Sequence, residues 1–305
     1  MRSCDERSAR PGGSFAARAG LIARAALLIS LATTTSACSS PGPGQSTEAT
    51  RTSSAQHSPG QMLERLRPGI GPGCDVPAGR VERVTLANSS FAERGKFRVY
   101  LPPCYDTERT RRYPVLYLLH GASEDDEYWL LLGLADAADA TIASRAIEPM
   151  IIVMPDGGPS FSPAADGTSF DSYLVDDLVP QVDRRWRTTA RRSGRAIGGI
   201  SLGGGRALET AANHPGLFTA VGGHSATIPR TADLPGRIAR GDLRAYLDVG
   251  AEDSLRSSDQ ALADELDQRG AAYEFHVSPG EHARAYWSAQ LPDYLRFYDA
   301  AFATG

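Results

Sequence analysis

The segment Gly-Ile-Ser-Leu-Gly at residues 199–203 constrains the fold of this chain more than any other segment. Its serine, Ser201, stands directly between a strand-like segment, Arg195–Ile200, and a helix-like segment, Leu202–Asn213. A G-x-S-x-G sequence in this position is typical of a sharp strand-to-helix turn that exposes the serine above a sheet. Side chains in place of the two glycines would clash with the neighbouring strand and helix. We therefore expect Ser201 at a helix N-terminus, where backbone amides favour negative charge.

Strand-like and helix-like segments alternate through residues 61–305, which we expect to form a single domain. The predicted strands are Val81–Ala87, Lys96–Pro102, Pro114–Leu119, Pro149–Met154, Arg195–Ile200, Phe218–Gly223, Ala245–Val249 and Tyr273–Val277. The predicted helices are Ala135–Ala146, Asp171–Trp186, Leu202–Asn213, Ser257–Gly270 and Ala283–Phe302. This alternation predicts a mostly parallel sheet with helices on both faces and functional residues at the carboxyl ends of its strands. The stretch between His224 and Ala245 is short, so no large lid is expected.

A serine hydroxyl is a weak nucleophile until a base takes its proton. The alternative interpretation of residues 198–205 is a glycine-rich turn with an incidental serine. The six histidines are His57, His120, His214, His224, His276 and His282. In folds with this turn the chain order is serine, acid, histidine, which excludes the first two.

Position in the predicted elements separates the remaining four histidines. His214 is expected to cap a helix end, and His276 falls inside a strand. His282 lies in a Pro-Gly-Glu loop directly after the strand Tyr273–Val277, where the base of such a fold belongs. We predict His282 as the base, with His224, at the end of an earlier strand, as the runner-up.

The base needs a carboxylate that orients its imidazole and stabilises the charged form. Residues 250–253, Gly-Ala-Glu-Asp, follow the strand Ala245–Val249. Asp253 is predicted as this acid, with Glu252 as the alternative. Asp248 lies nearer the strand interior and is expected to be structural.

Two backbone amides should stabilise the negative charge that develops on a carbonyl oxygen. One is predicted to come from Leu202, the residue after the nucleophile. The other is predicted to come from Ala122, in the loop after the strand Pro114–Leu119, where Gly121 permits close approach of the backbone. His120 opens this loop and is expected to fix it rather than to take part in the chemistry.

These segments resemble the putative-esterase family, which includes esterase D, the feruloyl esterases of cellulosomes, siderophore esterases and the mycobacterial mycolyltransferase antigens. The resemblance covers about residues 80–302 and implies the α/β-hydrolase fold. It rests on Leu-Leu-His-Gly at 118–121 with Trp129, Ile-Ile-Val-Met-Pro at 151–155, Asp-Leu-Val-Pro at 177–180, Gly-Ile-Ser-Leu-Gly-Gly-Gly at 199–205, Gly250-x-x-Asp-Ser-Leu at 250–255, and Gly280-x-His282 with Trp287. The resemblance implies ester hydrolysis through an acyl-enzyme without a metal or cofactor, and it places Asp253 and His282 as the acid and base.

The substrate is only partly defined by this resemblance. The three glycines after Leu202 and the run at residues 250–255 look most like feruloyl-esterase members, so a small-molecule or carbohydrate-linked feruloyl or acetyl ester is expected. Acyl transfer to a sugar hydroxyl, as in the mycolyltransferase relatives, is the alternative, and a non-catalytic binding module is a third. The loop after Gly121 is acidic at residues 124–127, which is interpreted as a solvated charged loop. The absence of a large lid suggests an open, shallow site suited to a bulky ester.

The first 60 residues are interpreted as a targeting segment and a tether. Arginines precede a short apolar run, Ala25–Ala32, and small residues lead to Cys38, as in a secretory signal peptide over residues 1–37. The small residues before Cys38 also resemble a bacterial lipobox, which implies lipidation of Cys38 and a membrane anchor. Plain secretion after cleavage at Ala37 is the alternative. Residues 38–60 are rich in Ser, Pro, Gly and Thr and are expected to form a flexible tether.

The four cysteines and the net charge narrow the remaining possibilities. Export places the chain where disulfides persist, and we predict a bridge between Cys74 and Cys104, at the outer ends of the first two strands. No pair has the C-x-x-C spacing of a zinc site. The formal charge of -4 gives no reason to expect nucleic-acid binding.

Overall fold

The computed structural model describes residues 76–86, 95–164, 167–231 and 233–304. The chain divides into two units, Met1–Gln56 and His57–Gly305, and every described residue belongs to the second. The predicted signal peptide, Cys38, the tether and Cys74 lie outside the described residues. No helix in the described part is long and apolar enough to span a bilayer.

The described residues contain one sheet of eight strands in the order β1-β2-β4-β3-β5-β6-β7-β8. The strands are β1 Arg80–Thr85, β2 Lys96–Leu101, β3 Val115–Leu119, β4 Ile151–Pro155, β5 Arg195–Ile200, β6 Ala220–His224, β7 Arg244–Gly250 and β8 Tyr273–Ser278. β2 pairs antiparallel with both β1 and β4, and all other pairs are parallel. All eight predicted strands are present, with no end shifted by more than two residues. The predicted, mostly parallel α/β-hydrolase sheet is confirmed.

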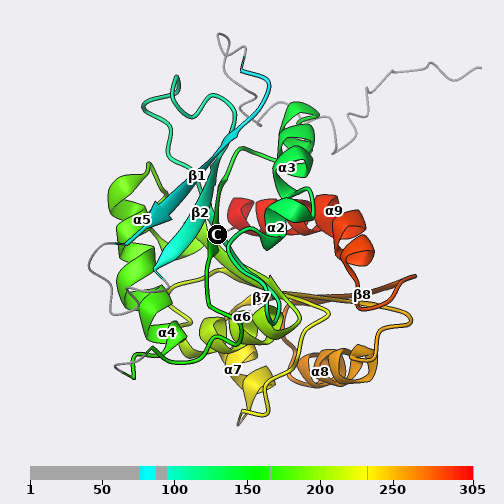
Figure 1. Cartoon of the computed structure of the whole chain (residues 1–305). Coiled ribbons are helices and arrows are strands. Elements are labelled where there is room, and N and C mark those ends of the chain that lie inside the picture. Colours follow the sequence, from blue (N-terminus) through cyan, green and yellow to red (C-terminus); the bar gives the residue numbers. More distant parts are fainter. Residues whose placement is uncertain (1–75, 87–94, 165–166, 232, 305) are drawn as a thin grey trace, which may run out of the picture. The chain divides into compact units, whose positions relative to one another are not determined.

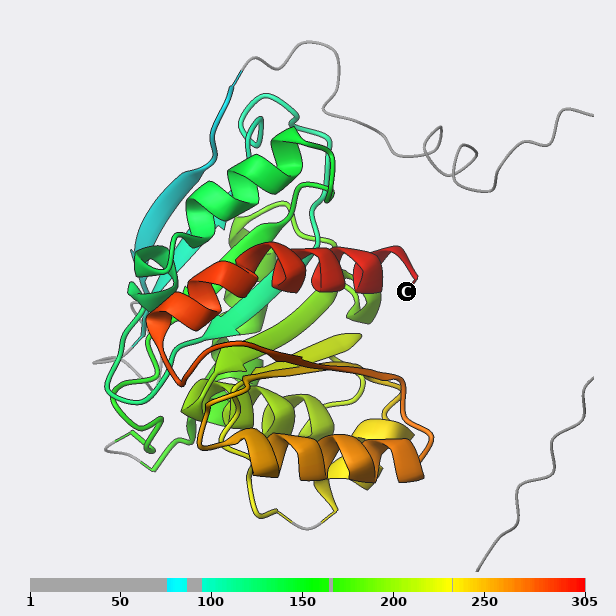
Figure 2. The same cartoon turned by 90° about the vertical axis from the view of Figure 1, so that its right-hand side faces the viewer.

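Helices cover both faces of the sheet (Figure 1; Figure 2). They are α2 Tyr128–Leu131, α3 Leu134–Ala143, α4 Phe170–Ser172, α5 Val179–Arg185, α6 Leu202–Asn213, α7 Leu234–Arg240, α8 Arg256–Gln268 and α9 Arg284–Ala303. A π-helical turn, η1 Tyr173–Leu178, joins α4 to α5, and a 3₁₀ turn, η2 Arg192–Gly194, precedes β5. The predicted helix Asp171–Trp186 is therefore three consecutive helical pieces. Among the described residues between β6 and β7 the single helix is the seven-residue α7, in agreement with the expectation of no large lid.

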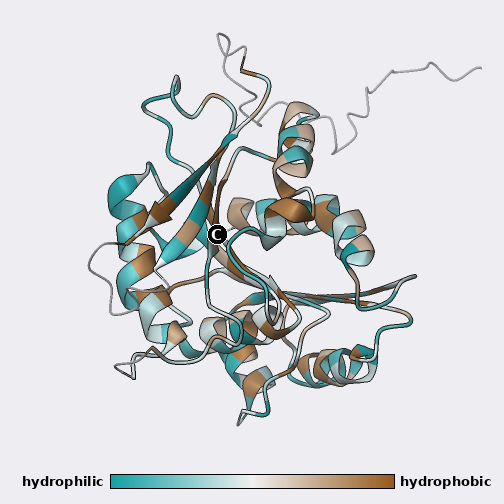
Figure 3. Ribbon diagram, viewed as in Figure 1, coloured by the Kyte–Doolittle hydropathy of each residue, from teal (hydrophilic) through white to brown (hydrophobic). Residues whose placement is uncertain are grey.

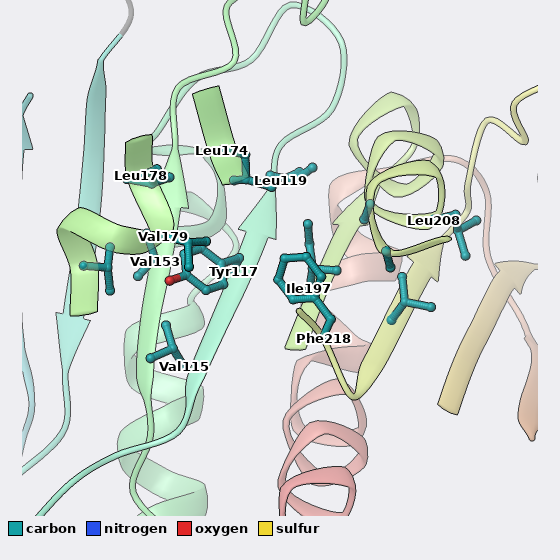
Figure 4. Packing of buried hydrophobic residues seen from close by; sticks show 14 of the residues in the cluster. Val115, Tyr117, Leu119, Val153, Leu174, Leu178, Val179, Ile197, Leu208 and Phe218 are labelled. Atoms are coloured by element: carbon teal, nitrogen blue, oxygen red, sulfur yellow. The ribbon is translucent and has the colours of Figure 1, made fainter. Parts of the chain in front are cut away.

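Alternation along β3 divides the core into two layers. Val115, Tyr117 and Leu119 pack with α5, α6 and α8 on one face, while Leu116 and Leu118 pack with α2, α3 and α9 on the other. Successive side chains of a strand point to opposite faces, so a strand covered on both sides must be apolar throughout. Figure 4 shows the first layer, where Tyr117 and Ile197 lie beside Phe218. Hydropathy follows the same plan, with apolar residues along the central strands and polar residues on the outer helix faces (Figure 3).

Candidate active site

Ser201 joins β5 to α6 in a strained backbone conformation. Its φ of 55° and ψ of −118° lie in a region that residues with a Cβ rarely adopt. A Cβ on Gly199 would fall 2.4 Å from the carbonyl oxygen of Gly203. The Ser201 amide donates to the His224 carbonyl at 2.9 Å, and the Ser201 carbonyl accepts from Gly205 and Thr227 at 3.1 and 2.9 Å. These contacts hold the turn in the conformation that exposes the serine side chain.

The structure brings together three predicted site residues from three loops. The Ser201 Oγ lies 3.0 Å from His282 Nε2, and His282 Nδ1 lies 2.8 Å from Asp253 Oδ2. Asp253 is 6% exposed, whereas the His282 side chain is 33% exposed. With the proton on Nδ1, the imidazole donates to the buried carboxylate and presents Nε2 as an acceptor for the serine hydroxyl. This is the geometry of a nucleophile, a general base and an orienting acid.

The loops that carry Asp253 and His282 are bonded to each other. The Glu252 amide donates to the Gly280 carbonyl at 3.0 Å, and the Gly280 amide donates to Glu252 Oε2 at 2.6 Å. Asp253 Oδ1 accepts from the Leu255 amide at 2.8 Å, which leaves Oδ2 for the histidine. Glu252, the alternative acid, therefore joins the two loops, and the carboxylate at the imidazole belongs to Asp253.

Trp287 supports the other side of the imidazole. Its ring meets that of His282 edge to face, with centroids 4.9 Å apart. Its Nε1 donates to Ser225 Oγ at 3.2 Å, in the loop that follows β6. Trp287 is 5% exposed, so its buried ring packs between the partly exposed His282 ring and the protein interior.

The two amides predicted to stabilise an oxyanion flank the serine. Leu202 is the first residue of α6, and Ala122 lies in the loop after β3. A Cβ on Gly121 would be 3.9 Å from Ser201 Cβ, so this loop runs beside the nucleophile. Within the described part of the chain, neither amide donates to a protein acceptor. Both are thus available to a bound oxygen.

His120 holds the loop of Ala122 in place. Its Nδ1 lies 2.7 Å from the Gly121 carbonyl, and its Nε2 accepts from the Gly157 amide at 3.0 Å. The ring is buried and stacks on Phe161 with centroids 4.7 Å apart. Burial lowers the pKa of His120, which favours the neutral form that this pair of hydrogen bonds requires. The side chain is thus bonded to the loop backbone, as expected.

The rings of the other described histidines contact groups other than the Ser201 hydroxyl. His224 is fully buried, with its Nδ1 2.7 Å from Asp248 Oδ1. His276 is exposed on β8. His214 is the C-cap of α6, as expected, and its amide donates to the Thr210 carbonyl at 3.0 Å, while its ring contacts Asp171 Oδ2 at 2.8 Å.

The acidic loop after Gly121 is not uniformly solvated. Asp126 is 1% exposed and lies 3.4 and 3.6 Å from the guanidinium groups of Arg83 and Arg98. Burial raises the pKa of Asp126, and the two arginines oppose that shift. Glu124 forms an ion pair with Arg284 at 3.8 Å. The interpretation of a solvated loop is therefore wrong for Asp126, because the β1–β2 ribbon brings two arginines over it.

No group of three or more histidine, cysteine or acidic side chains is arranged to hold a metal ion among the described residues.

The sheet order, the strained serine and its two partners define the site of an α/β hydrolase. The chain belongs to the Esterase family, described as putative esterase, whose family model matches residues 88–298.

Two proteins are similar in sequence to parts of the chain. The "Endo-1,4-beta-xylanase/feruloyl esterase" of Xylanibacter ruminicola is 30% identical over 221 residues, which are 66% of this chain and 30% of that protein. "Esterase Rv1288" of Mycobacterium tuberculosis is 36% identical over 135 residues, covering 42% of this chain and 28% of the relative. The chain thus spans less than a third of the length of either relative.

Solved structures share the fold. A ferulic acid esterase superposes with a TM-score of 0.67 at 25% identity, covering 74% of this chain and 99% of that one. The ferulic acid esterase of Anaeromyces mucronatus, solved with ferulic acid, gives a TM-score of 0.62 at 18% identity, with coverage of 76% and 94%.

Proposed function

We propose that this protein is a serine carboxylic-ester hydrolase that acts through an acyl-enzyme. The observation that carries the proposal is the contact of Ser201 Oγ with His282 Nε2, with Asp253 behind the imidazole. Membership of the esterase family supports it independently.

In the proposed reaction Ser201 Oγ attacks the ester carbonyl carbon while His282 Nε2 takes the hydroxyl proton. The carbonyl oxygen becomes an oxyanion that the amides of Leu202 and Ala122 stabilise. His282 then returns the proton to the departing alcohol, which leaves the acyl group on Ser201. Water, activated by the same imidazole, hydrolyses the acyl-enzyme and restores the serine.

The proposed substrate is a feruloyl or acetyl ester of a carbohydrate. The names of the relatives, a feruloyl esterase and a ferulic acid esterase, support the feruloyl group. The exposure of His282 and the short β6–β7 connection support an open site that a polymer-linked ester can reach. Acyl transfer to a sugar hydroxyl uses the same acyl-enzyme and stays the alternative.

Activity on graded esters tests the proposal. The full chain and its Ser201→Ala variant are compared on p-nitrophenyl esters of increasing acyl length and on methyl ferulate, with and without an added sugar acceptor. We expect the wild type to hydrolyse these esters and Ser201→Ala to be inactive. If the free acid is the sole product even when the sugar acceptor is present, the reaction is hydrolysis rather than acyl transfer. Equal activity of both proteins would remove Ser201 from the mechanism.

We further propose that the chain is exported and anchored through a lipid on Cys38. The basic and apolar segments before Ala37 support export. Metabolic labelling with a fatty-acid analogue tests this. Label in the wild type that is lost in Cys38→Ser supports the anchor, and an unlabelled, released wild type supports plain secretion.

A further inference from the structure

A buried polar network joins β6 and β7 to helix α9. The Asp248 carboxylate on β7 is 1% exposed and is surrounded by three partners. His224 Nδ1 contacts Oδ1 at 2.7 Å, while the hydroxyls of Tyr286 and Tyr294 donate to Oδ2 at 2.9 and 2.7 Å. A carboxylate buried to this degree needs such donors. The proposed catalytic steps use none of these four side chains.

The two tyrosines donate to the same oxygen but face different surroundings. Tyr294 lies two turns along α9 and stacks on His224, with ring centroids 3.7 Å apart. Tyr286 is in the first turn of α9, four residues after His282. A Cβ on Gly280 would fall 2.9 Å from Tyr286 Cδ2, so the tyrosine ring lies directly against the backbone of the loop that carries the base.

Gly280 is therefore held from two sides. Its amide and carbonyl are bonded to Glu252 in the acid loop, and its other side meets the Tyr286 ring. Gly280 has a φ of +139°, which favours glycine. Because glycine has no side chain, the Tyr286 ring can pack directly against its backbone. Any shift of the Tyr286 ring consequently moves the backbone two residues before His282.

We propose that Tyr286 is a positioning residue for the base. Its hydroxyl, anchored on Asp248, fixes the ring against Gly280 and so sets His282 between Asp253 and Ser201. Tyr294, which donates to the same oxygen, only stabilises the interior. This inference rests on the proposed function for its kinetic consequence, while the placement of His282 is measurable without any substrate.

The test compares Tyr286→Phe with Tyr294→Phe in the full chain. Each variant removes one hydroxyl from the same carboxylate oxygen and keeps the ring, so the two are matched in chemistry and burial. We expect similar losses of stability in urea unfolding. We expect Tyr286→Phe to lower kcat about tenfold with little change in KM, because a small misplacement of a catalytic group is costly. Tyr294→Phe should keep kcat within about twofold of wild type.

A substrate-free measurement separates this inference from the proposed function. The proton that His282 Nδ1 shares with Asp253 is followed by NMR and assigned by its loss in His282→Gln. We expect this signal to weaken or vanish in Tyr286→Phe and to persist in Tyr294→Phe. An unchanged signal in Tyr286→Phe, or equal loss in both variants, overturns the positioning role. A wild type that hydrolyses no ester and is not labelled by a fluorophosphonate overturns the proposed function instead, and the NMR comparison still decides the role of Tyr286.

Discussion

The backbone of Gly203 lies against the carbonyl group of His120, so closely that a Cβ on Gly203 would sit 2.1 Å from that oxygen. Gly203 is in the first turn of α6, next to Leu202, and His120 opens the loop that carries Ala122. One close approach therefore sets the distance between the two amides proposed to bind the oxyanion. It also gives a steric reason for the second glycine of the G-x-S-x-G segment.

Replacing Gly203 with alanine should disrupt this contact. Alanine has the higher helix propensity, by about 1 kcal/mol, but the clash with the His120 backbone outweighs that gain. We expect Gly203→Ala to lower both the melting temperature and kcat. Gly216→Ala is the control, because a Cβ there meets nothing within 4 Å. A Gly203→Ala variant with wild-type stability and activity would contradict this role of the contact.

Loss of the nucleophile should abolish turnover without unfolding the chain. Ser201→Ala is expected to lower kcat by a factor on the order of 10⁶, as for other serine nucleophiles. His282→Ala should fall comparably, because the hydroxyl then lacks its base. His224→Ala should mainly lower stability, since its ring is buried on Asp248 and Tyr294. Steady-state kinetics with circular dichroism on the same samples checks all three. Retention of more than a tenth of the activity by Ser201→Ala, or a larger loss of kcat in His224→Ala than in His282→Ala, would show that the assignment is wrong.

The two neighbouring acids can be distinguished by isosteric amides. Asp253→Asn should lower kcat by a factor of about 10⁴, the size of effect seen when the acid of a serine triad becomes an amide. Glu252→Gln keeps an oxygen for the Gly280 amide, so its effect on kcat should be small. The measurement is kcat for both variants on one ester. A larger loss in Glu252→Gln would make Glu252 the acid.

Much of this site could be predicted because its residues follow local rules. Continuous apolar runs mark strands covered on both faces, and the order of serine, acid and histidine selects loops at strand ends. The burial of Asp126 could not be predicted, since its arginine partners come from strands about 28 and 43 residues earlier, and only the antiparallel ribbon brings them near. The network around Asp248 likewise joins residues from β6, β7 and α9, with no pattern along the sequence to indicate it. The short helices α2 and α7 were missed because four and seven residues hold too few turns for a clear periodicity.

Asp259 should make stability depend on pH in a defined direction. It is fully buried in the first turn of α8, where Oδ1 accepts from the Ala226 amide at 3.1 Å. Burial raises the pKa of Asp259 to about 8, and the charges of Asp248 and Asp253 add to the shift. In the unfolded chain an aspartate ionises near pH 4. Between about pH 4 and pH 8 Asp259 is therefore ionised in the unfolded state but still protonated in the folded state, which favours the unfolded state as the pH rises. The contribution of Asp259 to the free energy of unfolding therefore falls across that window and is constant below it.

An isosteric variant isolates this contribution. Asp259→Asn keeps an oxygen for the Ala226 amide but cannot ionise, so it should gain stability relative to wild type as the pH rises. The expected gain between about pH 5 and pH 8 is on the order of several kcal/mol. Urea unfolding of both proteins across this range measures it. A difference that stays constant with pH would contradict a raised pKa at Asp259.

The predicted bridge between Cys74 and Cys104 should tie down the first two strands. Antiparallel pairing places Arg80 opposite Leu101, so the chain before β1 and the chain after β2 leave the sheet at the same end. Cys104 follows β2 and is 4% exposed, while Cys74 lies outside the described residues. A bridge would close a loop of roughly 30 residues, worth about 3–4 kcal/mol in the chain-entropy model.

Peptide mapping of the exported protein, purified without reductant and alkylated before digestion, decides whether this bridge exists. We expect one disulfide-linked peptide pair that contains Cys74 and Cys104. Cys104→Ser should then lower the melting temperature without changing kcat, because Cys104 follows β2, whereas the proposed chemistry lies at the carboxyl ends of β5, β7 and β8. Recovery of both cysteines as separately alkylated peptides would refute the bridge.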